Sequence, residues 1–378
     1  MTTLRQAYTP EQYSRAGWRH FDYVLLLVTL SLMAIGLLMI NSATFNSQDP
    51  DLVGVAKRQA LYALVGLAIL LLATGIDYRI WQNMRHGLYV IAVLFLIATL
   101  KFGTGEIGNV GRWLDLKAFP VQPSELAKIL LILALAGFLS ARSDQITKFK
   151  TVIMSLAYVG LPAFLIFFQP NLSTAMVFIF IWLAMAIAAG VRPRHLVLIG
   201  SGLIMSLPLI WLFMANYQRD RILSFLDPNR NPAARYNLDQ ALISVGSGGW
   251  LGQGYSSGSQ SQLHFLKVRH TDFIFSVTAE ELGFVGAVLL LVLFAVLLYR
   301  LIRIADKARD PYGQLVVVGV AAMIFFQAAI NIAMNLNLGL VAGLPLPFVS
   351  YGGSSLITML LAIGLAQSVI MRHKQIEF

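Results

Sequence analysis

Basic and acidic side chains meet in one short segment, residues 267–272, directly before a long apolar run. Its titratable and charged residues are Lys267, Arg269, His270 and Asp272. The basic groups can hold a pyrophosphate through charge-assisted hydrogen bonds. Asp272 would stand at a water–lipid boundary, where burial and neighbouring cations tune the pKa of a carboxyl group, as a catalytic base requires. Capping of the helix that follows is the alternative role of Asp272, and the residues alone do not decide between the two.

A second charged pair stands at the start of another apolar run, in residues 122–128 (Gln-Pro-Ser-Glu-Leu-Ala-Lys). Glu125 and Lys128 are three residues apart, so on a helix they share a face and can pair. Because charge at membrane depth costs a few kcal/mol, such a pair is a candidate for a functional site. A structural ion pair that fixes the helix at the outer interface is the alternative. Just upstream, Arg112 places a cation beside Trp113, which is equally typical of an interfacial anchor.

The last outer segment, residues 343–355, has an irregular backbone, with two Pro and three Gly in 13 residues. Such backbone is tolerated near a membrane only where it is buried in protein or lines a cavity. Its polar side chains are then available to a polar ligand. They are Ser350, Tyr351, Ser354 and Ser355. Two adjacent carboxylates, Glu280 and Glu281, cannot both face lipid, and the sequence leaves open whether they pair with Lys128, pair with an Arg or line a polar cavity.

The composition shows which elements must position these residues. Of 378 residues, 57% are hydrophobic and 12% are charged, and the mean hydropathy is +0.71. An ordinary soluble domain has about 25% charged residues, so a cytosolic enzyme, a secreted disulfide scaffold and a disordered chain are excluded. Ten apolar stretches approach the roughly 20 residues that cross a bilayer, and they predict ten transmembrane helices. They are residues 23–40, 59–75, 87–101, 125–140, 152–168, 172–190, 196–214, 273–299, 315–335 and 354–371.

The predicted fold class is therefore an all-α polytopic membrane protein, because lipid leaves backbone groups no partner outside a helix. A long extracytoplasmic loop, residues 215–272, separates helices 7 and 8; it carries Arg219 and Arg221, and residues 236–245 show a helical spacing of apolar side chains. Sixteen Lys and Arg lie in the segments that are cytoplasmic if the N-terminus is inside, against five in the short outer loops. Both termini are thus expected in the cytoplasm. We expect a cytoplasmic segment 1–22, one transmembrane domain 23–371 and a cytoplasmic tail 372–378.

Four groups of sequence segments resemble the SEDS family (shape, elongation, division and sporulation). They are QPSELAK, YQRDRI with FLDP, RHTDFIF with EELG, and GLPLPFVSYGGSS, and they occur in the family's order. The resemblance extends from about residue 20 to residue 373. Within the family, RWLDL and the Arg of RHTDF are more similar to the elongation members (RodA) than to the division members (FtsW).

The resemblance implies a peptidoglycan glycosyltransferase of the bacterial cytoplasmic membrane that polymerises lipid II into glycan strands at the outer face during elongation. It implies lipid-linked glycan as the second substrate, a class B penicillin-binding protein as partner, and other membrane proteins of the elongation complex, but no nucleic acid. The family carboxylate corresponds to Asp272, as general base. Substrate binding is expected of Glu125, Lys128, Arg112, Arg219, Arg221, Lys267, Arg269, His270, Ser350, Tyr351 and Ser354.

Two features of the resemblance leave questions open. The family turn often reads QPDLGT, whereas this chain has Asn171, which cannot ionise, so any role that needs a carboxylate there is in doubt. A divalent cation, Mg or Mn, could assist the reaction, but no ligand set is visible, since the chain has no Cys and six scattered His.

Two other classes of function share the same lipid substrate or the same partner. A lipid II flippase should carry polar residues along the whole depth of its pathway, whereas here they concentrate on the outer side. A scaffold for a partner synthase would not need Asp272 or the Glu125–Lys128 pair. The sequence therefore favours the enzyme over both, with a division-type polymerase as a further alternative within the family.

Overall fold

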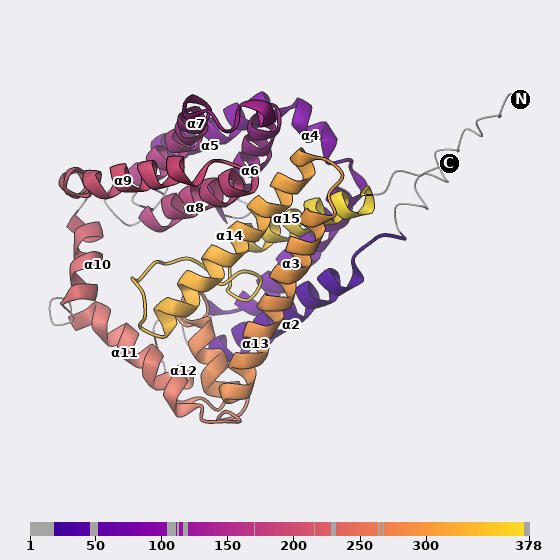
Figure 1. The fold of residues 1–378 in the computed structure, drawn as a ribbon. Helices are drawn as coiled ribbons and strands as arrows, with labels where there is room; N and C mark the ends of the chain where they lie inside the picture. The colour runs from indigo at the N-terminus through magenta and orange to yellow at the C-terminus, as the bar shows by residue number, and fades with distance from the viewer. Residues whose placement is uncertain are drawn as a thin grey trace, which may run out of the picture.

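Long apolar helices make up most of the chain in the computed structural model (Figure 1). The structure describes residues 19–45, 52–103, 111, 113–115, 120–169, 171–214, 216–227, 232–263, 265–266 and 268–373. Within these residues, nine helices are long and apolar enough to cross a membrane, and α8 is apolar but slightly shorter. The ten are α2 (Tyr23–Thr44), α3 (Val55–Gly75), α5 (Arg85–Phe102), α6 (Pro123–Ser140), α7 (Phe149–Phe168), α8 (Leu172–Ala188), α9 (Pro193–Phe213), α13 (Ile274–Asp306), α14 (Pro311–Asn335) and α15 (Gly353–Met371).

Each of these helices coincides with one predicted span, which confirms the all-α polytopic fold. The remaining elements are short. They are α4 (Arg79–Asn83), the 3-10 turn η2 (Ser143–Gln145), α10 (Asn216–Leu226), α11 (Pro232–Ser247), α12 (Ser259–Gln262), and an antiparallel two-residue ladder of β1 (Leu114–Asp115) with β2 (Pro120–Val121).

Two spans, α6 and α15, form the interior of the helix bundle, since most of their side chains are buried. α15 packs along α3 through small residues: a Cβ added to Gly364 would lie 2.6 Å from the carbonyl oxygen of Leu70. Such close approach is how helices associate in lipid, where apolar burial alone gives little advantage. At the other extreme, α9 lies at the periphery, and His195 is its one buried side chain among those described.

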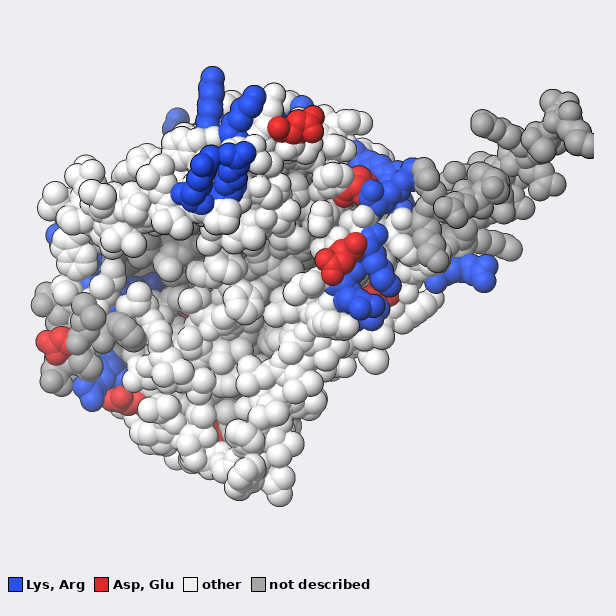
Figure 2. All heavy atoms as spheres, in the orientation of Figure 1, with Lys and Arg blue, Asp and Glu red and all other residues white. Residues whose placement is uncertain are grey.

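The surface shows the pattern of a protein that sits in a membrane. Figure 2 shows Lys and Arg at the top of the view near α7, on the right near the chain termini and again on the left around α10, with a broad uncharged area between. The end near the termini is tied together by charge, because Arg300 Nη2 lies 2.6 Å from Asp22 Oδ2 while Asp22 Oδ1 caps α2 by accepting from Leu25 N. The sidedness of the two ends remains a prediction.

The segment expected as a long outer loop, residues 215–272, is largely built from short helices in its described part. α10, α11 and α12 follow one another along one edge of the molecule between α9 and α13 (Figure 1). The helical spacing noted for residues 236–245 falls inside α11, which begins at Pro232, a favourable first residue of a helix.

The span α13 is not continuous, in contrast to the single helix that the sequence predicted. Gly283 has φ 69° and ψ −167°, which breaks the helix nine residues after its start at Ile274. The amide groups that the break releases are bound by the α11–α12 connection, because Phe284 N donates to Gly249 O at 2.8 Å and Val285 N donates to Trp250 O at 3.2 Å. A Cβ at Gly283 would lie 2.2 Å from Gly252 N, so the two backbones meet where no side chain fits.

Replacement of Gly283 by Ala should therefore destabilise the protein by more than about 1 kcal/mol, because Ala resists a positive φ and its Cβ would overlap Gly252. Gly160→Ala in α7 is the control, since nothing lies within 4 Å of its added Cβ. The measurement is the melting temperature of each detergent-purified variant, followed by loss of monodisperse protein. A melting temperature of Gly283→Ala equal to that of the wild type would contradict this account of the break.

Candidate functional site

The residues before α13 are held through their main chain by the irregular segment that precedes α15. The carbonyl oxygen of His270 accepts from Tyr351 N at 2.9 Å, and that of Thr271 accepts from Ser350 Oγ at 2.6 Å. Ser350 is buried and also accepts from Leu346 N at 2.8 Å. Ser350 and Tyr351, predicted as ligand-binding residues, thus fix the backbone beside Asp272.

The carbonyl oxygen of Asp272 is held by two buried amide side chains of α14. Asn331 Nδ2 and Asn335 Nδ2 each donate to it at 3.0 Å. Asn331 Nδ2 also donates to Leu344 O at 2.8 Å, so the same residue links the Asp272 segment to residues 340–344. Three successive carbonyls, those of residues 270, 271 and 272, are therefore bound from other elements.

The helix that follows is capped from α14 and not by Asp272. The N-cap residue of α13 is Phe273, whose side chain cannot accept a hydrogen bond. Asn335 Oδ1 accepts instead from Ser276 N at 3.1 Å and from Ser276 Oγ at 2.7 Å. Within the described part of the chain, no hydrogen bond is made to the Asp272 carboxylate.

The Asp272 carboxylate lies deep among protein atoms but keeps some exposure to solvent. Burial raises its pKa above the ordinary value, and the positive charge of Arg221 on α10 opposes that rise. Gly343 lies directly beside it, because a Cβ at that position would be 3.7 Å from Asp272 Oδ2. A carboxyl group whose pKa is raised in this way accepts a proton more readily, as a general base requires.

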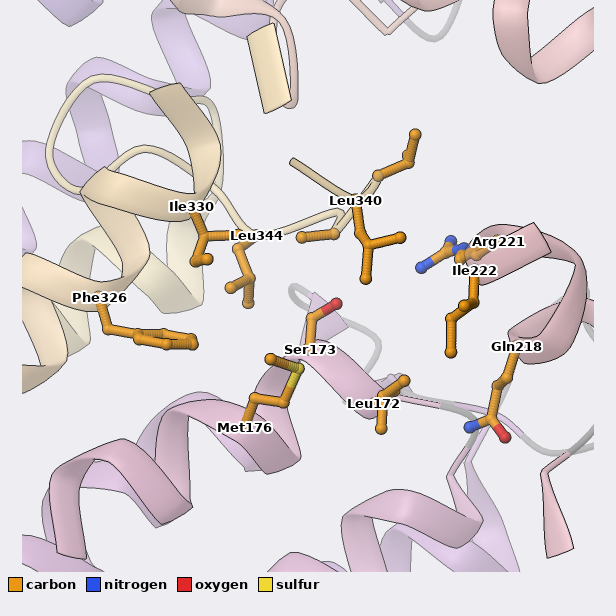
Figure 3. A pocket seen from close by; sticks show the side chains of 12 residues that line it. Leu172, Ser173, Met176, Gln218, Arg221, Ile222, Phe326, Ile330, Leu340 and Leu344 are labelled. Carbon is orange, nitrogen blue, oxygen red and sulfur yellow. The ribbon is translucent and has the colours of Figure 1, made fainter. Parts of the chain in front are cut away.

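An apolar pocket is lined by Arg221 and by Ala342 and Leu344, the neighbours of Gly343 in the chain (Figure 3). Its space amounts to about 630 Å³, which includes space open to solvent at the mouth. Its walls come from the start of α8, from α10, from the C-terminal half of α14 and from residues 340–344. Its polar lining residues are Ser173, Gln218 and Arg221, and Figure 3 shows the Ser173 hydroxyl and the Arg221 guanidinium directed into the space. Arg221 therefore belongs to both the pocket and the surroundings of Asp272.

The Glu125–Lys128 pair lies inside the protein and does not line this pocket. Lys128 Nζ is 2.6 Å from Glu125 Oε1, and the two side chains are 0% and 2% exposed. Glu125 Oε2 is buried and has no hydrogen-bond partner among the described residues. Nearby, Gln122 N donates to Ser354 Oγ at 3.1 Å, which joins the start of α6 to the start of α15.

Other predicted basic residues contact backbone oxygens. Arg219 donates to Trp211 O at 3.0 Å and to Leu212 O at 2.9 Å, so it binds the C-terminal end of α9. Arg269 is buried and donates to Ala43 O, and the His270 ring lies against Tyr351. Two further predicted site residues, Arg112 and Lys267, lie outside the described residues.

The two adjacent carboxylates of α13 anchor the connection between α11 and α13. Glu280 accepts from Gln260 N at 2.7 Å and from Ser261 N at 3.1 Å, so it caps the short helix α12. Glu281 accepts from Ser42 Oγ on α2 and from Gln262 Nε2 at 3.5 Å. Neither forms an ion pair with Lys128, one of the partners that the sequence left open.

Comparison with known proteins identifies the family. The model of the FTSW_RODA_SPOVE family, described as cell cycle protein, matches residues 22–375. The chain belongs to this family. It is 39% identical to stage V sporulation protein E of Bacillus subtilis (strain 168) over 92% of this chain and 96% of that protein. It is 36% identical to peptidoglycan glycosyltransferase MrdB of Escherichia coli (strain K12) over 95% of both chains.

Two solved structures share the fold. A chain from a study of polymerization and crosslinking by a peptidoglycan synthase complex superposes with a TM-score of 0.80 at 31% identity, over 94% of this chain and 99% of that chain. Thermus thermophilus rod shape determining protein RodA gives a TM-score of 0.69 at 31% identity, over 95% and 99% of the two chains. The predicted membership of the SEDS family, which comprises these proteins, is confirmed.

In this chain, Asn171 stands where the QPDLGT turn has Asp, and it caps the helix that follows. Asn171 Oδ1 accepts from Thr174 N at 3.3 Å and so caps α8. Asn and Asp are equally good helix caps, so the missing charge does not cost this interaction. α8 thereby begins at the wall of the pocket, with Ser173 in its first turn.

Reasoning from the sequence missed several residues of the site. Asn331 and Asn335 lie four residues apart in an apolar span, and buried polar residues at that spacing are a readable signal of a polar contact. Gln218 carries no comparable signal, because it is one polar residue in a polar segment. Among the described residues, no group of three His, Asp or Glu could hold a metal ion.

Replacement of Lys128 by an uncharged residue tests how much the buried Glu125–Lys128 pair contributes to the stability of the fold. Lys128→Met leaves the Glu125 carboxylate buried without its partner and should cost about 3–5 kcal/mol of stability. The double variant Glu125→Gln/Lys128→Met should recover most of that loss. Arg235→Gln, which breaks an exposed pair with Asp239, is the control and should cost less than about 1 kcal/mol. Unchanged melting of Lys128→Met would show that the pair does not stabilise the fold.

Proposed function

We propose that this protein is a peptidoglycan glycosyltransferase that polymerises lipid II at the outer face of the cytoplasmic membrane, with Asp272 as general base. The observation that carries the proposal is that Arg221 lines an apolar pocket and also acts electrostatically on the Asp272 carboxylate, which lies beside Gly343. A lipid-linked substrate with a charged head needs that combination of an apolar surface, a cation and a base. The relatives named as peptidoglycan glycosyltransferases support the same reaction class.

In the proposed reaction, Asp272 accepts the proton of a sugar hydroxyl on the acceptor lipid II. The freed oxygen forms a bond to the anomeric carbon of the lipid-linked glycan, and the bond from that carbon to the pyrophosphate oxygen breaks. Polyprenyl pyrophosphate leaves with the bonding electron pair, and Asp272 later returns its proton to water. A base with a pKa near the working pH is the most effective for such a transfer.

The pocket supplies the remaining parts of this mechanism. Its apolar walls, including Met176, Phe326 and Ile330, accommodate the first isoprene units of a polyprenyl chain. Arg221, directed into the same space, offsets the charge that develops on the pyrophosphate oxygens. A divalent cation, Mg or Mn, has no fitting ligand set among the described residues, and the steps above use protein groups alone.

The cellular setting follows from the relatives and the sequence. We place both termini in the cytoplasm and a class B penicillin-binding protein beside the chain, since one structural neighbour comes from a peptidoglycan synthase complex. Elongation, and not division or sporulation, is the proposed process because of RWLDL and the Arg of RHTDF. A test is complementation of cells depleted of the elongation polymerase, in parallel with cells depleted of the division polymerase.

The proposed activity is tested with purified protein, alone and with its class B partner, and lipid II in detergent with and without a divalent cation. The wild type should make long glycan, and Asp272→Asn should lower the rate by about 100-fold or more, because a general base contributes about 100- to 10,000-fold. Asp239→Asn on α11, an exposed carboxylate, is the control. If the protein makes no polymer under any condition but moves lipid II between leaflets, the proposed polymerase activity is wrong and the protein is a flippase.

The pH dependence of the polymerisation rate tests whether the charge of Arg221 acts on the proposed base, Asp272. Asp272 acts when deprotonated, so the rate should fall as the pH drops through its raised pKa. Arg221→Gln removes the charge that opposes the rise, and the acid limb of the rate profile should move to higher pH. Arg235→Gln, in the same outer segment, should leave the limb in place. A limb that is identical in Arg221→Gln and the wild type would show that this charge does not act on Asp272.

A further inference from the structure

The start of α13 needs a hydrogen-bond acceptor from outside the helix. The first N–H groups of any helix have no partner within it, and an Asp, Asn, Ser or Thr just before the helix usually supplies one. The N-cap residue here is Phe273, and the residue before it is Asp272. Asp272 is thus the nearest side chain in sequence for the capping role, which would bind its carboxylate to the backbone.

Asn335 supplies the acceptor from α14 instead. Its Oδ1 accepts from Ser276 N and Ser276 Oγ, at 3.1 and 2.7 Å. Its Nδ2 donates to the Asp272 carbonyl oxygen at 3.0 Å. One fully buried amide side chain therefore binds the residue before the helix and the first turn of the helix together.

Asn331 completes this arrangement and holds Asn335 in place. Its Oδ1 accepts from Asn335 Nδ2 at 3.2 Å, and its Nδ2 donates to both Asp272 O and Leu344 O. With the carbonyl oxygen of Asp272 fixed from two donors, its side chain is left to extend toward Gly343.

We propose that Asn335 is a positioning residue that caps α13 in place of Asp272 and so keeps the Asp272 carboxylate available to substrate. The consequence for catalysis rests on the proposed function. That Asn335 caps α13 in place of Asp272 is a property of the fold alone. Without Asn335, the unpaired first-turn N–H groups would draw the Asp272 carboxylate back onto its own helix.

Amide hydrogen exchange tests which residue caps α13, and the experiment does not require enzymatic activity. The readout is exchange in the peptide that contains residues 274–276, in Asn335→Ala, Asp272→Ala and the double variant. Each single variant should keep its exchange rate within about 3-fold of the wild type, because the other residue caps the helix. The double variant should exchange at least about 10-fold faster, since an uncapped helix end frays.

Thr278→Ala is the matched control for this experiment. It removes a buried side-chain bond one turn further on, from Thr278 Oγ to Ile274 O at 2.8 Å, and contacts neither Asn335 nor Asp272 through it. If Asn335→Ala alone exchanges as fast as the double variant, or if the double variant exchanges like the wild type, the proposal is overturned. Where Asn335→Ala does not fold, Asn335→Asp keeps the acceptor oxygen, and Asp272→Ala in that background should then leave exchange unchanged; a 10-fold increase there would overturn the proposal.

The pH profile of polymerisation tests the consequence for Asp272. In Asn335→Ala, kcat should fall about 10- to 100-fold with KM within 2-fold, as for impaired general-base catalysis. The acid limb should move to lower pH, because N–H donors stabilise the ionised carboxylate. Among the described residues, Arg221 on α10 is the charged group that acts on this carboxylate, and the His270 ring of its own segment lies against Tyr351; all three residues are unchanged in the variant.

A purely structural role gives a different profile. It would lower the yield of folded enzyme and leave the acid limb where it was, and that outcome would overturn the proposal. In Asn335→Asp, the limb should not fall below that of the wild type, since the cap is kept. If the wild type makes no polymer, the proposed function fails, while the exchange experiment still decides the capping role.

Discussion

The site depends on hydrogen bonds to three successive carbonyl oxygens, those of residues 270, 271 and 272. The first two are bound by the segment before α15, through Tyr351 N and Ser350 Oγ, and the third is bound by the amide groups of Asn331 and Asn335 on α14. Buried carbonyl groups at the edge of a membrane must find such partners, because an unpaired one costs several kcal/mol. The main chain is therefore immobilised while the carboxylate of Asp272 is left out of the network.

The need of buried backbone groups for hydrogen-bond partners also explains the irregular parts of the fold. α13 breaks at Gly283, and the amides released there bind the α11–α12 connection. Glu280 and Glu281 then hold that connection against α2 and α12 through their buried side chains. The polar residues of this region thus include those that satisfy a backbone that is not helical and the two charged residues of the site, Arg221 in the pocket and Asp272 beside Gly343.

The sequence predicted the structure well wherever a type of residue has only one favourable environment. Long apolar runs predicted the spans, since a helix is the structure that lipid permits, and Asp272 was found as a carboxylate at a membrane boundary. It was a poor guide where a partner lies far away in sequence. Nothing adjacent to Asp272 shows that its helix is capped by Asn335, 63 residues further on. The roles of Ser350, Arg219 and Glu280 as backbone ligands were likewise invisible, because each binds a carbonyl or amide group that every residue carries.

The central claim is that Asp272 is a largely buried carboxylate without a capping role, placed beside Gly343 and within reach of the charge of Arg221, which lines the apolar pocket. The most direct measurement is a titration of this carboxyl group itself, by infrared difference spectra between the wild type and Asp272→Asn across a pH series. The account predicts a protonated carboxyl band that disappears with a midpoint clearly above about 3.9, the ordinary value for Asp. A midpoint at or below that value would mean that the carboxylate is bound by hydrogen-bond donors or an ion pair, and it would contradict the account.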